Sequence, residues 1–290
     1  MPNTTQPVDL EQFPRLRTID YLSPFRYPGG KAFLTGFLSS IAQSVPDSGE
    51  VHYVEPFCGG AGAALGLLSQ NAVQHIHLND ADPRVYSAWH AIIYENDRFL
   101  SELSRRPVSI ETWHECRAII SDNPTGYSFD VGFATFFINR TSRAGIIIGS
   151  GPIGGYEQRG EWKIGARFYP ETIRKRLDWI GKNSEKITLS NVDGLDFLKK
   201  KAQELSSCST LYFVDPPYVK AGGRLYLDAM TEQKHRDLSN FLKTDACKNW
   251  VLTYDDHPLV RELYEGREIS SLNVNYSLRK TRKELELLVR

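Results

Sequence analysis

The sequence lacks long hydrophobic runs, paired cysteines and an apolar leading segment, and each absence excludes a class of protein. No stretch of the 290 residues approaches about 18 consecutive apolar positions, so we expect no membrane-spanning helix and no membrane partner. The four cysteines lie far apart and form no CxxC pair, which predicts neither a metal site nor a disulfide framework. Residues 1–17 contain no apolar core of a signal peptide. We therefore expect a soluble, cytoplasmic protein.

The chain also lacks an excess of either charge. Lys+Arg and Asp+Glu number 35 each, so the overall charge does not indicate a nucleic-acid partner. One segment departs from this balance, because residues 137–176 contain eight basic and three acidic side chains, a net charge of 8 − 3 = +5. These basic residues lie among glycines and aromatic residues. The pattern predicts either a phosphate-contacting surface or an ordinary solvated face.

Short apolar runs alternate with helix-length segments in two blocks of the chain. Strands are predicted at 52–57, 75–80, 187–193, 210–215, 249–255, 267–274 and 284–290. Helices are predicted at 61–70, 82–96, 195–205, 231–243 and 257–265. This alternation predicts an α/β fold whose mostly parallel sheet is covered on both faces.

The alternation stops between these two blocks. Residues 97–185 contain four prolines and the glycine-rich stretch AGIIIGSGPIGG, and we expect them to form an inserted, mainly helical subdomain. The predicted organisation is a polar, loosely ordered leader at 1–22, a catalytic domain at 23–96 and 186–290, and the insertion at 97–185.

A glycine-rich turn follows the first predicted strand. Gly59, Gly60 and Gly62 lie where this strand leads into its helix, so the backbone can approach a ligand closely. Asp80 ends the next strand, where an acid commonly accepts hydrogen bonds from ribose hydroxyls. Together they predict a ligand that contains adenosine. A nicotinamide dinucleotide and S-adenosylmethionine both fit at this stage.

The tetrapeptide Asp-Pro-Pro-Tyr ends the strand at 210–215 and favours S-adenosylmethionine. The two prolines cannot continue a central strand, which leaves Asp215 at its carboxyl end. The Asp215 carboxylate and the Pro216 carbonyl can each accept one N–H of an adenine amino group, which frees the nitrogen lone pair to attack a methyl group. Tyr218 can stack on a base that leaves the helix. A hydride-transferring enzyme has no use for this arrangement.

Several motifs resemble those of the Dam-like (class alpha) DNA adenine-N6 methyltransferases, and they occur in the same order along the chain as in that family. The resemblance runs from about Ser23 to the end of the chain. Its motifs include FRYPGGK, VEPFCGGAG, LNDADP, NRT, FYPETIR, NVDGLDFL, DPPYVKAGGRLY and VLTYDDHPLVRELY. The resemblance implies a Rossmann-like methyltransferase sheet of seven strands, one of them antiparallel, with S-adenosyl-L-methionine as cofactor. It also implies that the insertion is a target-recognition subdomain that binds double-stranded DNA, so that the protein associates with the nucleoid.

The resemblance further implies roles for residues in these motifs. Tyr27 and Lys31 would contact the cofactor, and the loop around Phe57, Gly59 and Gly60 would hold its methionine end.

The remaining cofactor contacts that the resemblance implies lie at other strand ends. Asp80 would bind the ribose, Asp215 would border the cofactor, and Asp193 would lie near the adenine, although Asp196 competes for that role.

The insertion departs from the family pattern directly after NRT. Dam-like enzymes that read GATC carry a Phe-Asn-Gly-like stretch there, whereas this chain has SRAGIIIGSGPIGG, which argues against GATC as its site. Arginine is suited to guanine in the major groove, so Arg140 and Arg143 are candidates for DNA contact. The alternative for Arg140 is an internal salt bridge. A cognate restriction or defence partner and the oligomeric state are left open.

The predicted function is the transfer of a methyl group from S-adenosylmethionine to the N6 amino group of a flipped adenine. One alternative is methylation of another amino group, such as cytosine N4, an RNA base or a protein amide. A second is a catalytically silent homologue that only binds DNA.

Overall fold

The computed structural model describes most of the chain, and the figures show the remaining segments in grey. The described residues are 6–14, 21–27, 29–45, 49–121, 124–219, 230–277 and 281–290.

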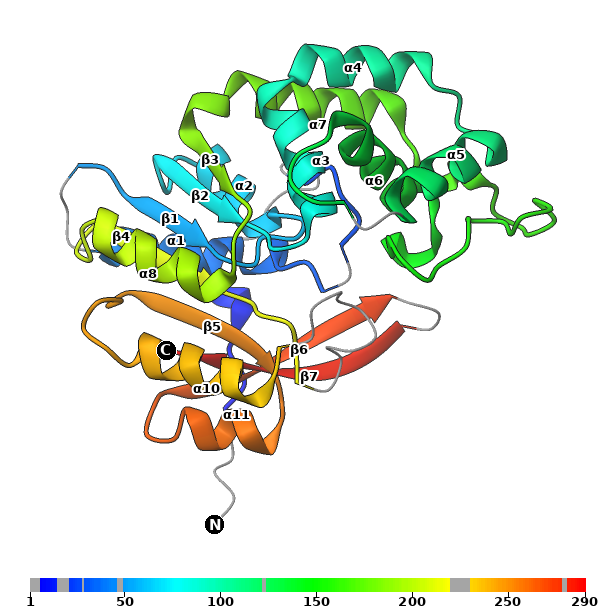
Figure 1. The fold of residues 1–290 in the computed structure, drawn as a ribbon. Coiled ribbons are helices and arrows are strands. Elements are labelled where there is room, and N and C mark those ends of the chain that lie inside the picture. Colours follow the sequence, from blue (N-terminus) through cyan, green and yellow to red (C-terminus); the bar gives the residue numbers. More distant parts are fainter. Residues whose placement is uncertain are drawn as a thin grey trace.

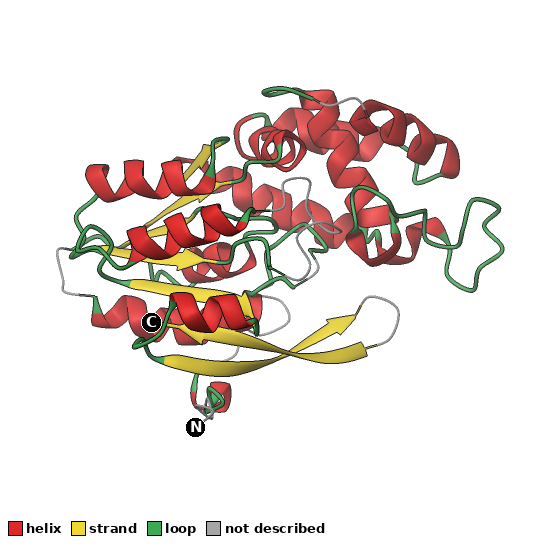
Figure 2. Ribbon diagram, turned by 60° about the horizontal axis from the view of Figure 1, so that its bottom comes forward, coloured by secondary structure: helices red, strands yellow, loops and turns green. Residues whose placement is uncertain are grey.

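A single seven-stranded sheet forms the centre of the molecule, with the strand order β3-β2-β1-β4-β5-β7-β6 (Figure 2). The strands are β1 (His52–Glu55), β2 (His75–Asn79), β3 (Ile187–Ser190), β4 (Thr210–Val214), β5 (Trp250–Asp255), β6 (Ile269–Ser277) and β7 (Thr281–Val289). β7 runs antiparallel to both of its neighbours, and the pairs from β3 to β5 are parallel. The predicted α/β fold with one antiparallel strand is confirmed.

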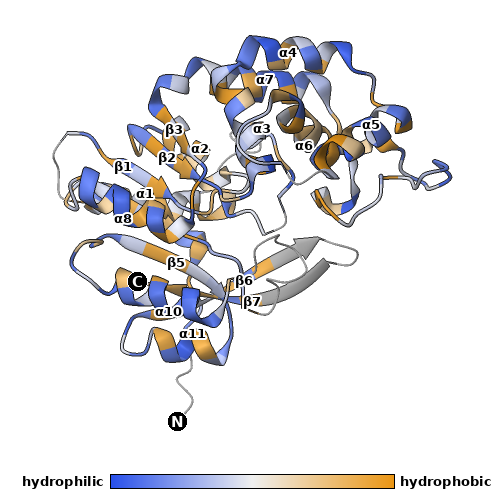
Figure 3. Cartoon of the chain, in the orientation of Figure 1, coloured by the Kyte–Doolittle hydropathy of each residue, from blue (hydrophilic) through white to orange (hydrophobic). Residues whose placement is uncertain are grey.

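The sheet is covered on both faces by helices, each of which buries an apolar side. On one face lie α1 (Thr35–Ser44), α2 (Gly62–Ser69) and α3 (Pro83–Tyr94), and on the other lie α8 (Gly194–Glu204), α10 (Glu232–Leu242) and α11 (Pro258–Leu263). Every residue of β4 and β5 is buried, as expected for central strands. In Figure 3, only part of β5 has the hydrophobic colour, whereas the outer surfaces of α8 and α10 carry many hydrophilic residues.

The segment between β2 and β3 is mainly helical. Its helices are α4 (Asn96–Arg105), α5 (Ile110–Ser121), α6 (Phe129–Thr141) and α7 (Pro170–Lys182). All residues of α6 except Asp130 are buried, because α3 and α5 pack against it. Between α6 and α7 the chain projects outward from this helical lobe (Figure 1). The proposed division into domains remains a prediction.

Short 3-10 helices complete the described structure. They are η1 (Leu10–Gln12), η3 (Ala32–Leu34), η4 (Arg143–Gly145), η5 (Ile164–Arg167) and η6 (Ser184–Lys186). No helix in the described parts of the chain has both the length and the apolar character needed to cross a bilayer.

Part of the leader is ordered, contrary to the expectation of a loose segment. Val8 donates its backbone N–H to Ser271, whose own N–H is donated to Gln6, so this segment extends the sheet beyond β6. The Phe13 ring packs edge-on against Phe37. The difference arises because Val8, Leu10 and Phe13 pack against the hydrophobic core, which the polar composition of the segment did not reveal.

Candidate active site

The predicted site residues gather at one edge of the sheet. Asp215 follows β4, the Gly59–Gly60 turn follows β1, Asp80 follows β2 and Asp193 follows β3. These four strands are neighbours and parallel, so their carboxyl ends meet at the same edge. Open α/β sheets bind ligands there.

Three donors fix the carboxylate of Asp215. Thr253 Oγ1 donates to Oδ1 at 2.7 Å, and the Tyr218 hydroxyl donates to the same oxygen at 3.1 Å. Lys31 Nζ donates to Oδ2 at 2.8 Å. Because each carboxylate oxygen offers about two lone-pair sites, Oδ1 is saturated and Oδ2 retains one acceptor position. The side chain of Asp215 is 21% exposed, so this position can be reached.

Lys31 is the cation at the centre of this arrangement, and its side chain is almost fully buried. Its ammonium donates to Gly29 O at 2.8 Å and to the Tyr218 hydroxyl at 2.9 Å, as well as to Asp215. Glu286 Oε2 lies 3.5 Å away. Burial alone would lower the pKa of Lys31, but the Asp215 and Glu286 carboxylates raise it above its usual value. Its predicted contact with the cofactor is untested.

The glycine turn is held by side chains from three other segments. Gly59 donates its N–H to Asp80 Oδ2 at 3.0 Å and accepts a hydrogen bond from Trp89 Nε1 at 2.7 Å. The ring of Tyr27 lies against the turn, since a Cβ at Gly59 would come within 2.7 Å of it. The structure therefore brings Tyr27 and the turn together. Trp89 was missed because its helix showed only an amphipathic pattern.

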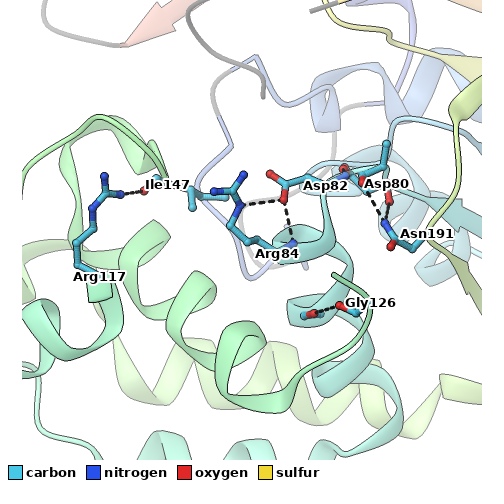
Figure 4. A network of polar contacts seen from close by, with 9 residues as sticks. Asp80, Asp82, Arg84, Arg117, Gly126, Ile147 and Asn191 are labelled. Carbon is cyan, nitrogen blue, oxygen red and sulfur yellow. Dashed lines mark hydrogen bonds and ion pairs between the residues drawn. The ribbon is translucent and has the colours of Figure 1, made fainter. Parts of the chain in front are cut away.

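Asp80 lies between the glycine turn and the next loop. The backbone N–H of Asp82 donates to its Oδ1 at 3.0 Å, so each carboxylate oxygen has one donor and keeps one free lone pair. Burial and, to a smaller extent, the charge of Asp82 raise the pKa of Asp80 to about 7. Asn191 donates to the backbone carbonyl of Asp80 at 2.8 Å, which fixes the loop after β3 beside it (Figure 4).

Asp193 caps α8 by accepting the N–H of Leu195 at 2.9 Å, and it forms an ion pair with Lys234 on α10 at 2.9 Å. Asp196 lies in the first turn of the same helix and is exposed. The structure places both residues near the sheet edge and does not choose between them.

Two apolar side chains border this part of the edge. The ring of half-buried Phe57 packs on Gly194, where a Cβ would come within 2.5 Å of it. Val192 is 46% exposed, although Asn79 holds its backbone through both N–H and C=O. Sequence reasoning missed Val192. Val192 lies between Asn191 and Asp193, and its exposure at the sheet edge becomes apparent only from the loop geometry.

Arg140 does not lie on the surface, which corrects its assignment to DNA contact. It is buried, and its guanidinium donates to the backbone carbonyls of Pro24 and Arg167. Burial, with smaller contributions from nearby arginines, lowers the pKa of Arg140 to about 9. The alternative prediction, an internal salt bridge, is nearer to what the structure shows. Arg140 does make internal contacts, but its partners are backbone carbonyls and not an acid. Arg143 is exposed and stays a candidate.

The motif NRT also contains an orienting residue that the sequence did not reveal. Asn139 accepts the N–H of Arg26 at 2.8 Å and donates to Arg26 O at 3.1 Å. Gly145 approaches the same carbonyl so closely that a Cβ would lie 1.9 Å from it. These contacts tie the FRYPGGK loop to the insertion. In the described parts of the chain, no cluster of three or more His, Cys, Asp and Glu side chains could hold a metal.

Comparison with known families agrees with the motif reading. The family model of the D12 class N6 adenine-specific DNA methyltransferases matches residues 27–118, a segment that includes the glycine turn and Asp80 and ends before Asp215. This match confirms the resemblance, and with it the enzyme class and S-adenosylmethionine as cofactor. No curated protein matches the sequence significantly.

The comparison with solved structures returned, among others, two of the rRNA methyltransferase AviRa from Streptomyces viridochromogenes. They are 15% and 14% identical, each comparison covering 95% of this chain and 90% of that one, with TM-scores of 0.39 and 0.36. An S-adenosylmethionine-dependent methyltransferase from Agrobacterium tumefaciens is 10% identical, with 88% and 59% of the two chains covered and a TM-score of 0.40. The fold assignment here rests on the strand order itself.

Proposed function

We propose that this chain, an adenine-specific methyltransferase by its family match, methylates the N6 amino group of an adenine flipped out of duplex DNA. The observation that carries the proposal is the bonding of Asp215. Its Oδ1 is saturated by Thr253 and Tyr218, whereas Oδ2 keeps one acceptor position at a partly exposed sheet edge. That position suits one N–H of an amino group, and the Pro216 carbonyl suits the other.

The edge also offers what S-adenosylmethionine requires from a protein. Asp80 keeps one lone pair on each oxygen for the ribose hydroxyls. Phe57 and Val192 offer apolar surface for the adenine ring, with Asp193 beside them. The glycine turn and Tyr27 would hold the methionine end. When bound, the cofactor supplies the electrophilic methyl group of its sulfonium.

Asp215 and Pro216 act on the target nitrogen. By accepting its two hydrogens they favour a pyramidal geometry and free the lone pair for in-line attack. The N6–C bond forms while the S–C bond breaks, the electron pair stays on sulfur, and Asp215 Oδ2 accepts the proton that the nitrogen loses. The Tyr218 hydroxyl is fixed by Lys31 and Asp215, so its ring is oriented to stack on the flipped base.

The projecting segment between α6 and α7 supplies the DNA contacts in this proposal. Its exposed aromatic side chains include Tyr156 and Trp162, the latter 64% exposed. Arg143, Arg159 and Arg167 are exposed in the same segment. Cationic side chains bind phosphates, and aromatic rings can enter the base stack. The segment projects from the helical lobe into solvent (Figure 1).

The decisive experiment is methyl transfer from labelled S-adenosylmethionine to unmethylated genomic DNA, followed by mass spectrometry of the nucleosides. We expect N6-methyladenine with the wild-type protein. Asp215→Ala should lower the rate by about a hundredfold or more, with DNA affinity nearly unchanged. Asp178→Ala, which removes an exposed carboxylate on α7, is the matched control.

Other products would redirect the assignment. Methylated cytosine, or methyl transfer to RNA only, would support the alternative substrates. Cofactor binding without any transfer would support a silent DNA-binding homologue. Near-normal activity of a folded Asp215→Ala variant would refute the catalytic role of Asp215.

A further inference from the structure

We infer that Glu286 is a positioning residue for methyl transfer, because its buried carboxylate holds the Lys31 ammonium against Asp215. The inference rests on the proposed function and deepens it, since neither the motifs nor the family match covers the last strand.

Glu286 is buried within the sheet. It belongs to β7 and pairs with Asp255 of β5 on one side and Leu272 of β6 on the other. Its side chain is 1% exposed, and Lys31 Nζ lies 3.5 Å from its Oε2. A buried carboxylate is costly unless a cation accompanies it. The pairing with Lys31 therefore explains how an acid can occupy the apolar stretch LELLV.

The position of Lys31 determines which lone pair of Asp215 Oδ2 remains available to accept a hydrogen bond from the target amino group. The ammonium donates to Gly29 O, Asp215 Oδ2 and the Tyr218 hydroxyl, and Glu286 Oε2 lies 3.5 Å from it on the remaining side. Glu286 attracts this ammonium from the sheet side. If the ammonium moved, one lone pair of Oδ2 would change direction, and the target nitrogen would lose its alignment. Small misplacements of this kind cost large factors in rate.

The first test replaces Glu286 by glutamine, which keeps the shape and removes the charge. We expect Glu286→Gln to lower the single-turnover rate of methyl transfer on the order of 10- to 100-fold, with cofactor and DNA affinity changed little. Glu268→Gln is the matched control, because Glu268 is an exposed acid at the end of the same sheet, paired with Arg290 at 2.5 Å. We expect this control to react at the wild-type rate.

The pH profile separates this role from a merely structural one. Asp215, Tyr218, Glu55 and Glu286 face Lys31, and among them Asp215 and Glu286 raise its pKa against the effect of burial. Without Glu286 the ammonium should lose its proton at a lower pH. We expect the alkaline decline of the rate to move to lower pH in Glu286→Gln, whereas a loosened fold would lower the rate equally at all pH values.

Two further measurements keep the inference falsifiable. If Glu286 acts through Lys31, then adding Glu286→Gln to a Lys31→Met variant should cause no further loss of rate. Independently of activity, the side-chain nitrogen resonance of Lys31 in ¹⁵N-lysine-labelled protein should titrate at lower pH in Glu286→Gln. A folded Glu286→Gln variant with the wild-type rate and pH profile would overturn the inference. Absence of any methyl transfer by the wild-type protein would instead refute the proposed function.

Discussion

Asp80 shows how a single carboxyl group can be prepared for one task. It holds the glycine turn through one oxygen and the loop after β2 through the other. Burial raises its pKa to about 7, although both backbone hydrogen bonds favour the charged form. Asp193, by contrast, is half-exposed and paired with Lys234, and its pKa is lowered. Between pH 6 and pH 8, therefore, Asp80 changes its charge and Asp193 stays ionised.

We predict that cofactor affinity depends on the protonation of Asp80. The carboxylate accepts ribose hydroxyls, whereas the acid form has lost an acceptor, so affinity should rise as the pH increases through about 7. If only the carboxylate binds, the gain from pH 6 to pH 8 is about tenfold. Calorimetric titration with S-adenosylmethionine at several pH values measures it.

The control is Asp80→Asn, which should bind more weakly and without this rise. The difference between the two proteins isolates Asp80 from the titration of the cofactor's own amino group. A rise of equal size in Asp80→Asn would show that Asp80 does not cause it.

At the scale of elements, the crossing of α3 and α6 joins the helical lobe to the sheet. Gly132 on α6 faces the backbone of α3 so closely that a Cβ would lie 2.4 Å from Ser87 O. The contact partner is main chain, which cannot rotate away. A larger residue at position 132 would therefore push the two helices apart.

We predict that Gly132→Ala destabilises the protein despite the better helix propensity of alanine. That propensity favours the variant by about 1 kcal/mol, whereas overpacking against backbone costs about 1–3 kcal/mol. The free energy of unfolding from urea titration should therefore fall by up to about 2 kcal/mol. Gly165→Ala is the control, since its Cβ would meet only Val108 at 3.8 Å. Equal stability of the two variants would refute the close contact.

The elements were largely predictable because each one depends on local pattern. β4 and β5 are continuous apolar runs, and α3 starts at Asp82 and Pro83 as its capping residues indicate. The fine structure of the site was not predictable in this way. Lys31 meets Asp215 across 184 residues, and no local pattern encodes that contact.

The misses have the same origin. Arg140 looked like a surface cation because composition does not reveal burial, and its partners are carbonyls that every residue carries. Glu286 did leave a signal, since it is the one acid in the otherwise apolar stretch LELLV. Such a residue is a reason to search for a buried cation.

For the whole molecule, zero net charge means that DNA must be bound by a local surface. Arg143 and Arg167, exposed in the projecting segment, are the candidates. Several other surface cations are already paired with acids, and Arg159 of the same segment lies 3.7 Å from Glu157. Arg105 and Lys182, for example, form ion pairs within α4 and α7. Each cation that contacts a phosphate releases counterions, so the salt dependence of affinity counts such contacts.

We predict that replacing Arg143 and Arg167 together by alanine lowers the slope of log affinity against log salt by about 2, since each phosphate contact contributes about 0.9. Fluorescence anisotropy with a labelled duplex between about 50 and 200 mM salt measures the slope. Arg105→Ala with Lys182→Ala removes the same formal charge from paired positions and should leave the slope unchanged. If both double variants lowered the slope equally, DNA would respond to overall charge and the projecting segment would not be its binding surface.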